Sequence, residues 1–250
     1  MEFLKLYETH EDYERDENKP IFGHCIEEIE LHFYEREPKL YDYLHIDGTF
    51  DNNKTDDVIG ICILTDEQNT YNPYGPIFVL LGGAQDSFSD TTFTINSAST
   101  TVNNGLDNSI FLSSSEAANF KAAKTATNVL KNLYYDSGIE NWEEMAEASD
   151  AVPYLPSVNE FSAFFNKVDL NEVNEKISEF NIIYYEGHPI MNASPIPREG
   201  HWLSSVNKYN NPSYMTAGES QATYPSGSIT TQSKKIRPFL HLKKYIEREK

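Results

Sequence analysis

The feature that most constrains the fold is a helix start at Ser157, directly after Pro156. Glu160 follows Ser157 at the third position, which is the spacing of a capping box. In this motif the Ser hydroxyl accepts from a free backbone N–H, and the Glu carboxylate reaches back to the cap. Pro156 fixes an extended entry and disfavours a helical conformation at Leu155. The sequence therefore predicts a helix from Ser157 with one apolar side, formed by Phe161, Phe164, Phe165 and Val168.

The other predicted elements mix strands with helices. Two apolar runs predict buried strands at 58–64 and 76–81, and an alternating pattern predicts a half-buried strand at 29–33. Further strand-like stretches lie at 41–46, 182–185, 201–205, 228–231 and 236–242. Helices are expected at 115–134, 139–148 and 171–180. The polar stretch 86–115 is expected to be a long loop with one short strand at 92–95, laid over a scaffold.

The charge of the chain is strongly negative and unevenly distributed. The sequence has 39 Asp and Glu against 20 Lys and Arg, a net charge of −19. Residues 1–57 hold 17 acidic and 6 basic residues, whereas residues 234–250 hold seven basic and two acidic residues. Because phosphate contacts dominate nucleic-acid affinity, we expect no nucleic-acid partner. The basic C-terminus is expected to dock on an acidic protein surface.

Cysteine content and hydropathy bear on compartment. Cys25 and Cys62 are the only cysteines, and Cys62 lies in an apolar run, where a buried thiol acting as a small hydrophobe is favoured over a disulfide or a reactive thiol. No apolar run approaches the roughly 20 residues that span a bilayer, so membrane insertion is not expected. Glu2 and Glu8 surround Phe3 and Leu4, which is unlike a signal peptide. We therefore expect the chain to fold in a cytoplasm.

No metal site or cofactor is predicted. His188 and His201 flank a Pro-rich loop and could meet in space, but isolated hydrogen-bonded histidines are commoner than metal ligands. The segment from Asp51 to Asp57 has the oxygen ligands of a calcium loop. It lacks the alternating Asp/Asn pattern and the closing Glu, so a solvated loop is favoured.

No catalytic residue is predicted either. Gly82 and Gly83 follow a strand but lack the later Lys-Ser/Thr of a phosphate loop. The run 113–115 of three serines lacks the flanking glycines of a nucleophile elbow and is expected to cap a helix. The acidic pairs Asp56-Asp57 and Glu143-Glu144 are of a kind that so acidic a chain contains by chance.

One segment has the composition of a recognition surface. Tyr, Asn and Ser supply rigid amphipathic contact area and adaptable hydrogen bonds. The candidate binding residues are Trp202, Asn207, Tyr209, Asn210, Tyr214 and Tyr224, with Asn211 and Gln221 between them. The alternative is a polar loop whose tyrosines cover the core beneath it, and composition alone does not separate the two.

Three islands together carry a resemblance. They are Leu155-Pro156-Ser157 with Glu160, Trp202-Leu203-Ser204-Ser205, and Ile236-Arg237-Pro238-Phe239. Their order and spacing resemble the C-terminal half of a C-type-lectin-like family, the branch related to formylglycine-generating enzymes that includes Lcl C-terminal-like domains and many phage receptor-binding modules. Leu203 stands where the family usually has Ser. The resemblance implies an α+β fold with a C-type-lectin-like domain at residues 41–250.

The start of the chain resembles something narrower. The stretch 3–14, followed by Cys25 and the stretch 30–34, is similar to the leader of virion proteins from tailed phages of gut Bacteroidales, including the crAss-like group. Ile21 to His24 departs from the usual residues of those leaders. The resemblance implies that residues 1–40 form a virion-attachment segment. Its attachment residues would be Phe3, Leu4, Leu6, Tyr7 and Tyr13.

Taken together, the resemblances imply a non-enzymatic head fibre or capsid decoration protein, assembled into the virion in the host cytoplasm. Its partners would be capsid or other virion proteins, further copies of itself in a dimer or trimer, and a host-surface glycan or protein. A tail-fibre receptor-binding protein, a secreted adhesin and a structural spacer without ligand stay open. From a different class, a formylglycine-generating-type enzyme stays open too, although that chemistry needs reactive cysteines in the C-terminal half.

Overall fold

The computed structural model describes residues 6–7, 24–25, 36–70, 75–96, 100–136, 150–185, 188–216, 218–219, 221–225 and 230–243. The strands are β1 (Leu6–Tyr7), β2 (His24–Cys25), β3 (Tyr43–His45), β4 (Phe50–Asp51), β5 (Val58–Leu64), β6 (Ile77–Leu80), β7 (Ala84–Ser87), β8 (Ala151–Tyr154), β9 (Ile182–Tyr185), β10 (His188–Asn192), β11 (Gly200–Val206), β12 (Pro212–Thr216), β13 (Ser233–Ile236) and β14 (Phe239–Leu242). The helices are α3 (Gly105–Ser114), α4 (Lys121–Thr127), α5 (Val129–Asp136), α7 (Val158–Lys167) and α8 (Leu170–Ser178). These residues form a sheet-rich α+β fold with a curled sheet and five helices, as the predicted mixture of elements implies.

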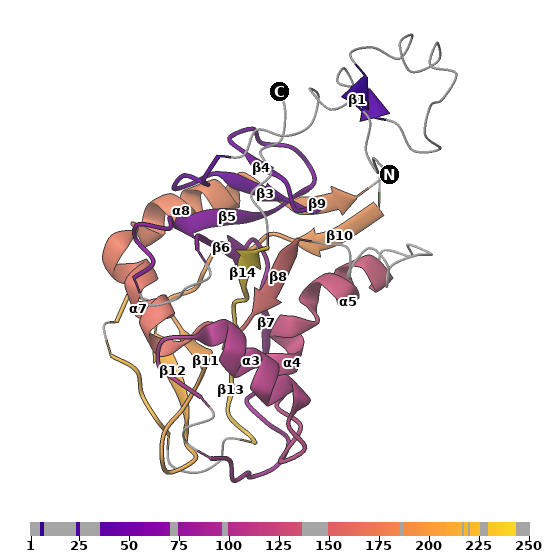
Figure 1. Cartoon of the computed structure of the whole chain (residues 1–250). Coiled ribbons are helices and arrows are strands. Elements are labelled where there is room, and N and C mark those ends of the chain that lie inside the picture. Colours follow the sequence, from indigo (N-terminus) through magenta and orange to yellow (C-terminus); the bar gives the residue numbers. More distant parts are fainter. Residues whose placement is uncertain are drawn as a thin grey trace.

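Two sheets form the framework of the body. The larger has six strands in the order β4-β3-β5-β6-β14-β8, and all its pairs are antiparallel. The smaller has the order β12-β11-β13-β7, with β11 and β13 parallel. In Figure 1, β3, β4 and β5 lie in the upper part of the body and β11, β12 and β13 in the lower part.

The chain passes from one sheet to the other at two neighbouring places. The chain leaves β6 in the large sheet and enters β7 in the small one through Leu81, Gly82 and Gly83. It returns from β13 to β14 through Arg237 and Pro238. Because β13 pairs with β7 and β14 pairs with β6, the two crossings run side by side. Bends of this kind form the corners of packed sheets.

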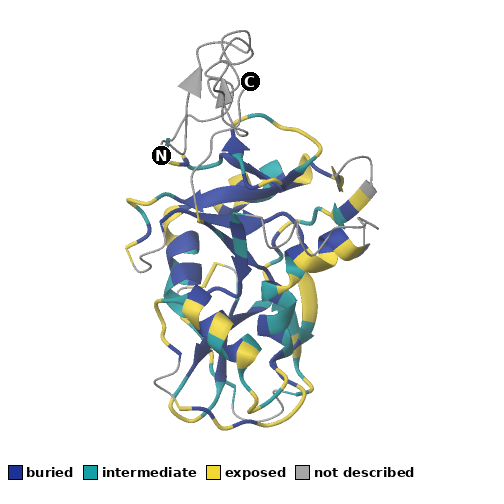
Figure 2. Ribbon diagram, turned by 45° about the vertical axis from the view of Figure 1, so that its right-hand side comes forward, coloured by how far each residue is buried: buried dark blue, intermediate teal, exposed yellow. Residues whose placement is uncertain are grey.

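The larger of two hydrophobic cores lies on the six-stranded sheet. Every residue of β5 and β6 is buried, as a strand covered on both faces requires. Phe161 and Phe164 of α7 pack on Phe239 of β14, with ring centroids 6.0 and 6.1 Å apart. Val173 and Ile177 of α8 and Leu130 of α5 complete this core. Figure 2 shows the buried residues running through the centre of the body.

The second core fills the space between α3, α4 and the four-stranded sheet. It is aromatic: the Trp202 ring packs edge-on against Phe88, and Phe120 contacts Phe88 and Phe93. The helix side is made of small residues, Ala122, Ala123 and Ala126, all with no exposed surface. Small side chains let α4 approach the aromatic layer closely, and the rings of Phe88, Phe120 and Trp202 have no exposed surface.

The capped helix is confirmed. α7 begins after Ser157, and both hydrogen bonds of the capping box are present. Phe161, Phe164 and Val168 are buried, and Phe165 is half-buried. The strands predicted at 58–64, 76–81, 182–185 and 201–205 and the helix at 171–180 are confirmed within two residues at each end.

The segment between residues 86 and 134 was predicted wrongly. Residues 105–114 form helix α3 where a loop was expected, and 92–95 form no strand. The helix expected over 115–134 begins only at Lys121 and is divided at Asn128 into α4 and α5. Ser115 ends α3, and Ser113 and Ser114 lie in its last turn, so these serines do not start a helix.

Two C-terminal strand predictions need correction. The strand expected at 236–242 is interrupted, because Pro238 has no N–H to continue a ladder and the chain changes sheets there. The strand expected at 228–231 does not include Thr230 or Thr231; the strand of this region is β13. The strand predicted at 29–33 and the helix predicted at 139–148 lie outside the described residues, as do Glu143 and Glu144.

The N-terminal region contributes two described strands. β1 and β2 pair with each other in parallel, and among the described residues they pair with no strand of the larger sheets. The described part of the body begins at Arg36, which donates to the Asp42 carboxylate at 2.6 Å. Pro38 is buried, so residues 36–40 contact the body although the predicted division assigns them to the attachment segment. Within the part of the chain that the structure describes, no helix has the length and apolarity to cross a membrane.

Candidate functional site

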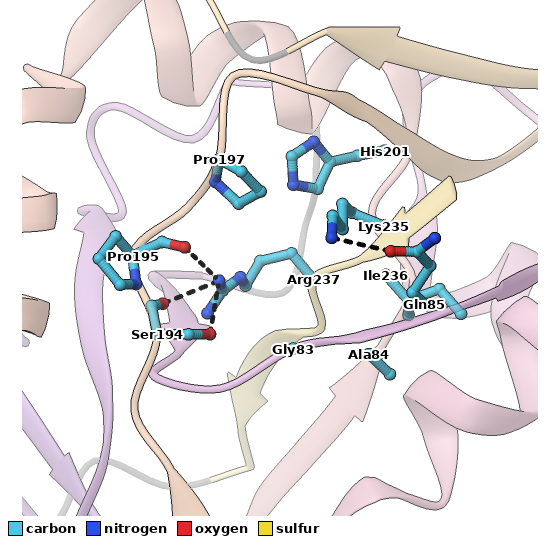
Figure 3. Close-up of a pocket in the computed structure, with 10 residues that line it drawn as sticks. All are labelled: Gly83, Ala84, Gln85, Ser194, Pro195, Pro197, His201, Lys235, Ile236 and Arg237. Atoms are coloured by element: carbon cyan, nitrogen blue, oxygen red, sulfur yellow. Dashed lines mark hydrogen bonds between the residues drawn. The ribbon is translucent and has the colours of Figure 1, made fainter. Parts of the chain in front are cut away.

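A pocket of about 390 Å³ lies beside the two sheet crossings. Four chain segments line it: the start of β7, the connection after β10, His201 on β11, and the end of β13 with Arg237. Its lining residues are Gly83, Ala84, Gln85, Ser194, Pro195, Pro197, His201, Lys235, Ile236 and Arg237. Figure 3 shows His201, Lys235 and Arg237 around one space, with Pro195 and Pro197 on its other side.

Arg237 is a buried cation that holds the pocket together. Nη1 donates to the carbonyl oxygens of Leu80 and Leu81 at 3.0 and 2.9 Å. Nη2 donates to the carbonyl oxygens of Ser194 and Pro195 at 2.9 and 3.1 Å, and to the Ser194 hydroxyl. Burial lowers the pKa of Arg237 to about 10, so the guanidinium remains charged at neutral pH. The cation therefore provides hydrogen bonds to carbonyls at the bend, of which Leu81 O also accepts from Ser194 N.

Two glycines pack closely where the connection after β6 meets Arg237 and Met191. A Cβ on Gly83 would lie 3.0 Å from the Ile236 carbonyl oxygen and 3.3 Å from the Arg237 guanidinium. A Cβ on Gly82 would lie 2.4 Å from the sulfur of Met191. Gly82 and Gly83 thus permit close backbone packing at the bend, which is a structural use of a Gly pair.

His201 presents an unpartnered nitrogen to the pocket. Its residue is 1 % exposed, and Nδ1 lies 2.8 Å from the carbonyl oxygen of Glu199. Since a carbonyl oxygen only accepts, Nδ1 carries the proton and Nε2 of the neutral ring is an acceptor. Nε2 is buried and has no partner among the described residues. An unsatisfied buried acceptor costs about 1–3 kcal/mol.

The environment of His201 keeps the ring neutral. Burial, together with the positive charges of Arg237 and Lys235, lowers the pKa of His201 to about 4, although the hydrogen bond to Glu199 opposes this shift. At neutral pH the ring therefore accepts at Nε2. The pocket wall consequently offers an acceptor next to cationic donors.

Lys235 closes the solvent side of the pocket. Its Nζ donates to Gln85 Oε1 at 2.8 Å and lies 3.6 Å from Glu199 Oε2. Both side chains of this ion pair are partly exposed, so the pair is screened and contributes little to stability. Glu199 is the one carboxylate that the described ion pairs bring to this pocket.

The predicted recognition residues do not form one surface. Trp202 has no exposed surface, and its Nε1 donates to the Asp86 carbonyl at 3.0 Å. Its assignment to a binding surface is therefore corrected: the indole fills the second core. Asn207 and Asn210 have structural bonds: Asn207 Oδ1 accepts from the backbone of Tyr209 and Asn211, and Asn210 Oδ1 accepts from Ile95 N at 2.8 Å.

The tyrosines of the set differ in exposure. Tyr209 is 71 % exposed near the turn between β11 and β12, with the Lys208 ammonium 5.1 Å from its ring centroid. Tyr214 is half-buried between Trp202 and Lys234, whose Nζ lies 4.1 Å from the ring centroid. Tyr224 is half-buried, and burial raises its pKa. Tyr209 is thus the member of the set that is open to a partner.

The predicted attachment residues have limited description. Leu6 and Tyr7 form β1, but their side chains lie outside the described residues, as do Phe3, Leu4 and Tyr13.

Cys62 is a buried free thiol whose pKa is raised by burial, in agreement with the prediction of a buried cysteine. The side chains of Cys25 and His188 also lie outside the described residues, so the possible meeting of His188 with His201 is not described.

The segment from Asp51 to Asp57 encloses a histidine. His45 Nε2 lies 3.0 Å from Asp51 Oδ1, and Nδ1 lies 3.2 Å from Asp57 Oδ1. Asp51 also accepts from the backbone and the side chain of Asn53. Among the described residues, no group of three or more His, Cys, Asp or Glu side chains is arranged to hold a metal ion.

Comparison with known proteins gives little beyond this geometry. No protein-family model matches the chain. No curated protein sequence matches it. Among solved structures, the chain is similar to a fimbrial protein from Bacteroides ovatus ATCC 8483, with 16 % identity and a TM-score of 0.46 over 88 % of this chain and 50 % of that one. The chain thus spans about half the length of that fimbrial protein.

Proposed function

We propose that the protein is a non-enzymatic structural component of a phage virion, a head fibre or capsid decoration. Its N-terminal segment attaches to the particle, and the body from Arg36 onward faces outward. There it contacts a glycan or protein of the host surface. The tail-fibre receptor-binding role differs only in the place of attachment.

The observation that carries this proposal is the separation of the N-terminal strands from the sheets of the body. The six- and four-stranded sheets draw their described strands from Tyr43 onward, and β1 and β2 pair with each other. Figure 1 draws β1 outside the two larger sheets. The described strands of this segment, β1 and β2, add no strand to the two larger sheets, and an extended segment of this kind can add a strand to another protein.

A C-type-lectin-like domain is the finer fold that we propose for the body. The three sequence islands behind that resemblance contact one another: Ser204 N donates to Pro156 O at 2.8 Å, and Phe161 stacks on Phe239. Leu155, Trp202 and Ile236 share the second core. The three islands are thus neighbours in the folded body.

The absence of enzyme activity is part of the proposal. Formylglycine-type chemistry requires reactive cysteines in the C-terminal half, and this sequence has none after Cys62. Burial raises the pKa of the Cys62 thiol, which disfavours the nucleophilic thiolate. Incubation with a cysteine-containing sulfatase peptide should leave the peptide mass unchanged, and conversion of its cysteine would contradict the proposal.

Particle attachment is tested by deleting residues 1–35. We expect tagged full-length protein to be found on particles by immunogold electron microscopy, and the deleted form to be lost from them. Circular dichroism and thermal unfolding should show that the deleted form keeps its body. Retention of the deleted form on particles, or absence of the full-length form, would contradict the proposal.

The proposed assembly is a homo-oligomer, a dimer or a trimer. Closed symmetric assembly is usual for proteins of this kind. Light scattering after size-exclusion chromatography of the full chain gives the copy number, and a strictly monomeric protein at particle-like concentrations would remove this part of the proposal.

A further inference from the structure

The fold holds the polar groups of the pocket around His201 in fixed positions. Its cationic floor, Arg237, is fixed by five hydrogen bonds, and its acceptor wall, His201, is held by Glu199. A volume of about 390 Å³ lies at the small end of the range for ligand pockets. The site therefore suits a molecule of monosaccharide size.

One buried hydrogen-bond acceptor at the pocket, Nε2 of His201, has no donor among the described residues. Figure 3 shows the ring edge of His201 directed toward the space bounded by Pro197, Lys235 and Arg237. A ligand that satisfies Nε2 must donate a hydrogen bond to it, as a hydroxyl group can.

The pocket also carries a surplus of positive charge. Within the described part of the chain, the guanidinium of Arg237 bonds to neutral oxygens through Nη1 and Nη2. Its Nε–H has no part in these bonds. Lys235 shares its charge with Glu199, whose side chain is 64 % exposed. The uncompensated cation favours an anionic group, and a carboxylate matches the paired donors of Arg237 and Lys235.

We propose that this pocket binds a hydroxylated carboxylate of the acidic-sugar class, such as the hexuronic acid of a surface polysaccharide. The sugar carboxylate accepts from the Lys235 ammonium and from Nε–H of Arg237, and a ring hydroxyl donates to His201 Nε2. Pro195 and Pro197 offer the apolar contact that the face of a sugar ring requires. The inference rests on the proposed outward-facing role of the body and names its ligand.

Other ligand classes fit the same groups less well. A neutral sugar satisfies His201 but leaves the charge of Arg237 without a counter-ion. Acetate or another simple carboxylate satisfies the charge but leaves Nε2 without a donor. A metal cation is disfavoured, because Arg237 and Lys235 repel it and, among the described residues, the ion pairs bring only the Glu199 carboxylate near it.

The test is calorimetric titration of the full-length protein with glucuronic acid and galacturonic acid, with glucose, acetate and inorganic phosphate as comparisons. We expect at least one uronic acid to bind at least tenfold more tightly than glucose, acetate or phosphate. Equal binding of glucose overturns the role of charge, and equal binding of acetate or phosphate overturns the role of the hydroxyl. The absence of uronic-acid binding overturns the proposal.

Uronic-acid binding by two pocket variants and one matched control tests whether the ligand binds at this pocket. Lys235→Met and His201→Phe should each weaken uronic-acid binding at least tenfold. Lys234→Met removes the same charge one residue earlier on β13, where Nζ lies over Tyr214, and should bind like the unchanged protein. Lys235 is partly exposed, so Lys235→Met tests the site even if His201→Phe fails to fold. Unchanged binding in Lys235→Met overturns the inference.

The proposed ligand of the pocket and the proposed virion role can be contradicted independently of each other. If tagged protein is on particles and particles adsorb to cells equally well with or without Lys235→Met and free glucuronic acid, the pocket inference is wrong and the virion role stands. If purified protein binds uronic acid but is absent from particles, the virion role is wrong and the pocket stands.

Discussion

Glu160 and Gly105 are 55 residues apart in the sequence, and Glu160 Oε2 accepts a hydrogen bond from Gly105 N at 2.9 Å. The same oxygen accepts from Ser157 N at 2.8 Å. One buried carboxylate thus serves the N-termini of α3 and α7, where negative charge is favourable. A Cβ on Gly105 would lie 2.4 Å from this oxygen, so the contact requires glycine at that position.

Replacing Glu160 with Gln should therefore destabilise the body. The amide keeps the shape of the side chain but loses the charge that two backbone donors and the Tyr154 hydroxyl share. Hydrogen bonds to a charged group contribute about 1.5–3 kcal/mol, so we expect unfolding free energy to fall by at least about 2 kcal/mol in urea titrations.

The matched control is Glu175→Gln on the exposed side of α8. It removes the same charge from a solvated position and should change the unfolding free energy by less than about 0.5 kcal/mol. Equal stability of the two variants would show that the shared carboxylate does not join α3 to α7.

Substitutions of Trp202 and Tyr209 should have different effects on stability, because Trp202 is a core residue and Tyr209 is a surface residue. Trp202→Ala should cost about 3–5 kcal/mol, because the indole is buried and its Nε1 bonds to Asp86. Tyr209→Ala should leave thermal unfolding within about one degree, because the ring is exposed. If instead Tyr209→Ala destabilises and Trp202→Ala does not, the placement of the two residues is wrong.

The contrast between α7 and α3 shows what local sequence can predict. α7 has its cap, its entry proline and its apolar side within about a dozen residues, so local patterns suffice. α3 buries polar side chains instead: Asn108 donates to Ser204, and Ser109 donates to the Leu155 carbonyl. Those partners lie 46 or more residues away, so the burial of these polar residues beside Leu106 and Leu112 could not be read from the hydrophobic pattern of α3.

The candidate site could be predicted only in part for the same reason. The sequence contains the motif Ile236-Arg237-Pro238, but the carbonyls to which Arg237 donates are set by where β6 and β14 leave their sheet. His201 was considered as a histidine near a Pro-rich loop, whereas its neutral acceptor role follows from the Glu199 carbonyl. Nothing in a one-dimensional pattern places these residues around one pocket.

Arg237→Met should be among the most destabilising single changes. It leaves the carbonyls of Leu80, Ser194 and Pro195 without their Arg237 donor, whereas the Leu81 carbonyl keeps the Ser194 N–H. Since each unsatisfied buried group costs about 1–3 kcal/mol, we expect a loss of at least about 3 kcal/mol, read as a lower urea midpoint. Arg198→Met, at an exposed position, should leave the midpoint unchanged; similar midpoints for both variants would contradict the structural role of Arg237.

His201 predicts a specific dependence of stability on pH. Its folded pKa of about 4 lies below the ordinary value of 6.5, so between these values the unfolded chain binds a proton that the folded protein does not. Stability contributed by the neutral ring is therefore complete above pH 6.5 and decreases as the pH falls toward 4. The shift corresponds to about 3 kcal/mol.

The measurement is urea unfolding at pH 7 and pH 4.5 of the unchanged protein and of His201→Phe, which fills the same space without titrating. Groups other than His201 contribute to both proteins, so the difference between the two pH dependences isolates the imidazole. We expect the unchanged protein to lose about 2–3 kcal/mol more than the variant between the two pH values. Equal losses of unfolding free energy in the two proteins would show that the folded ring binds its proton as readily as the unfolded one. The neutral acceptor role of Nε2 would then be wrong.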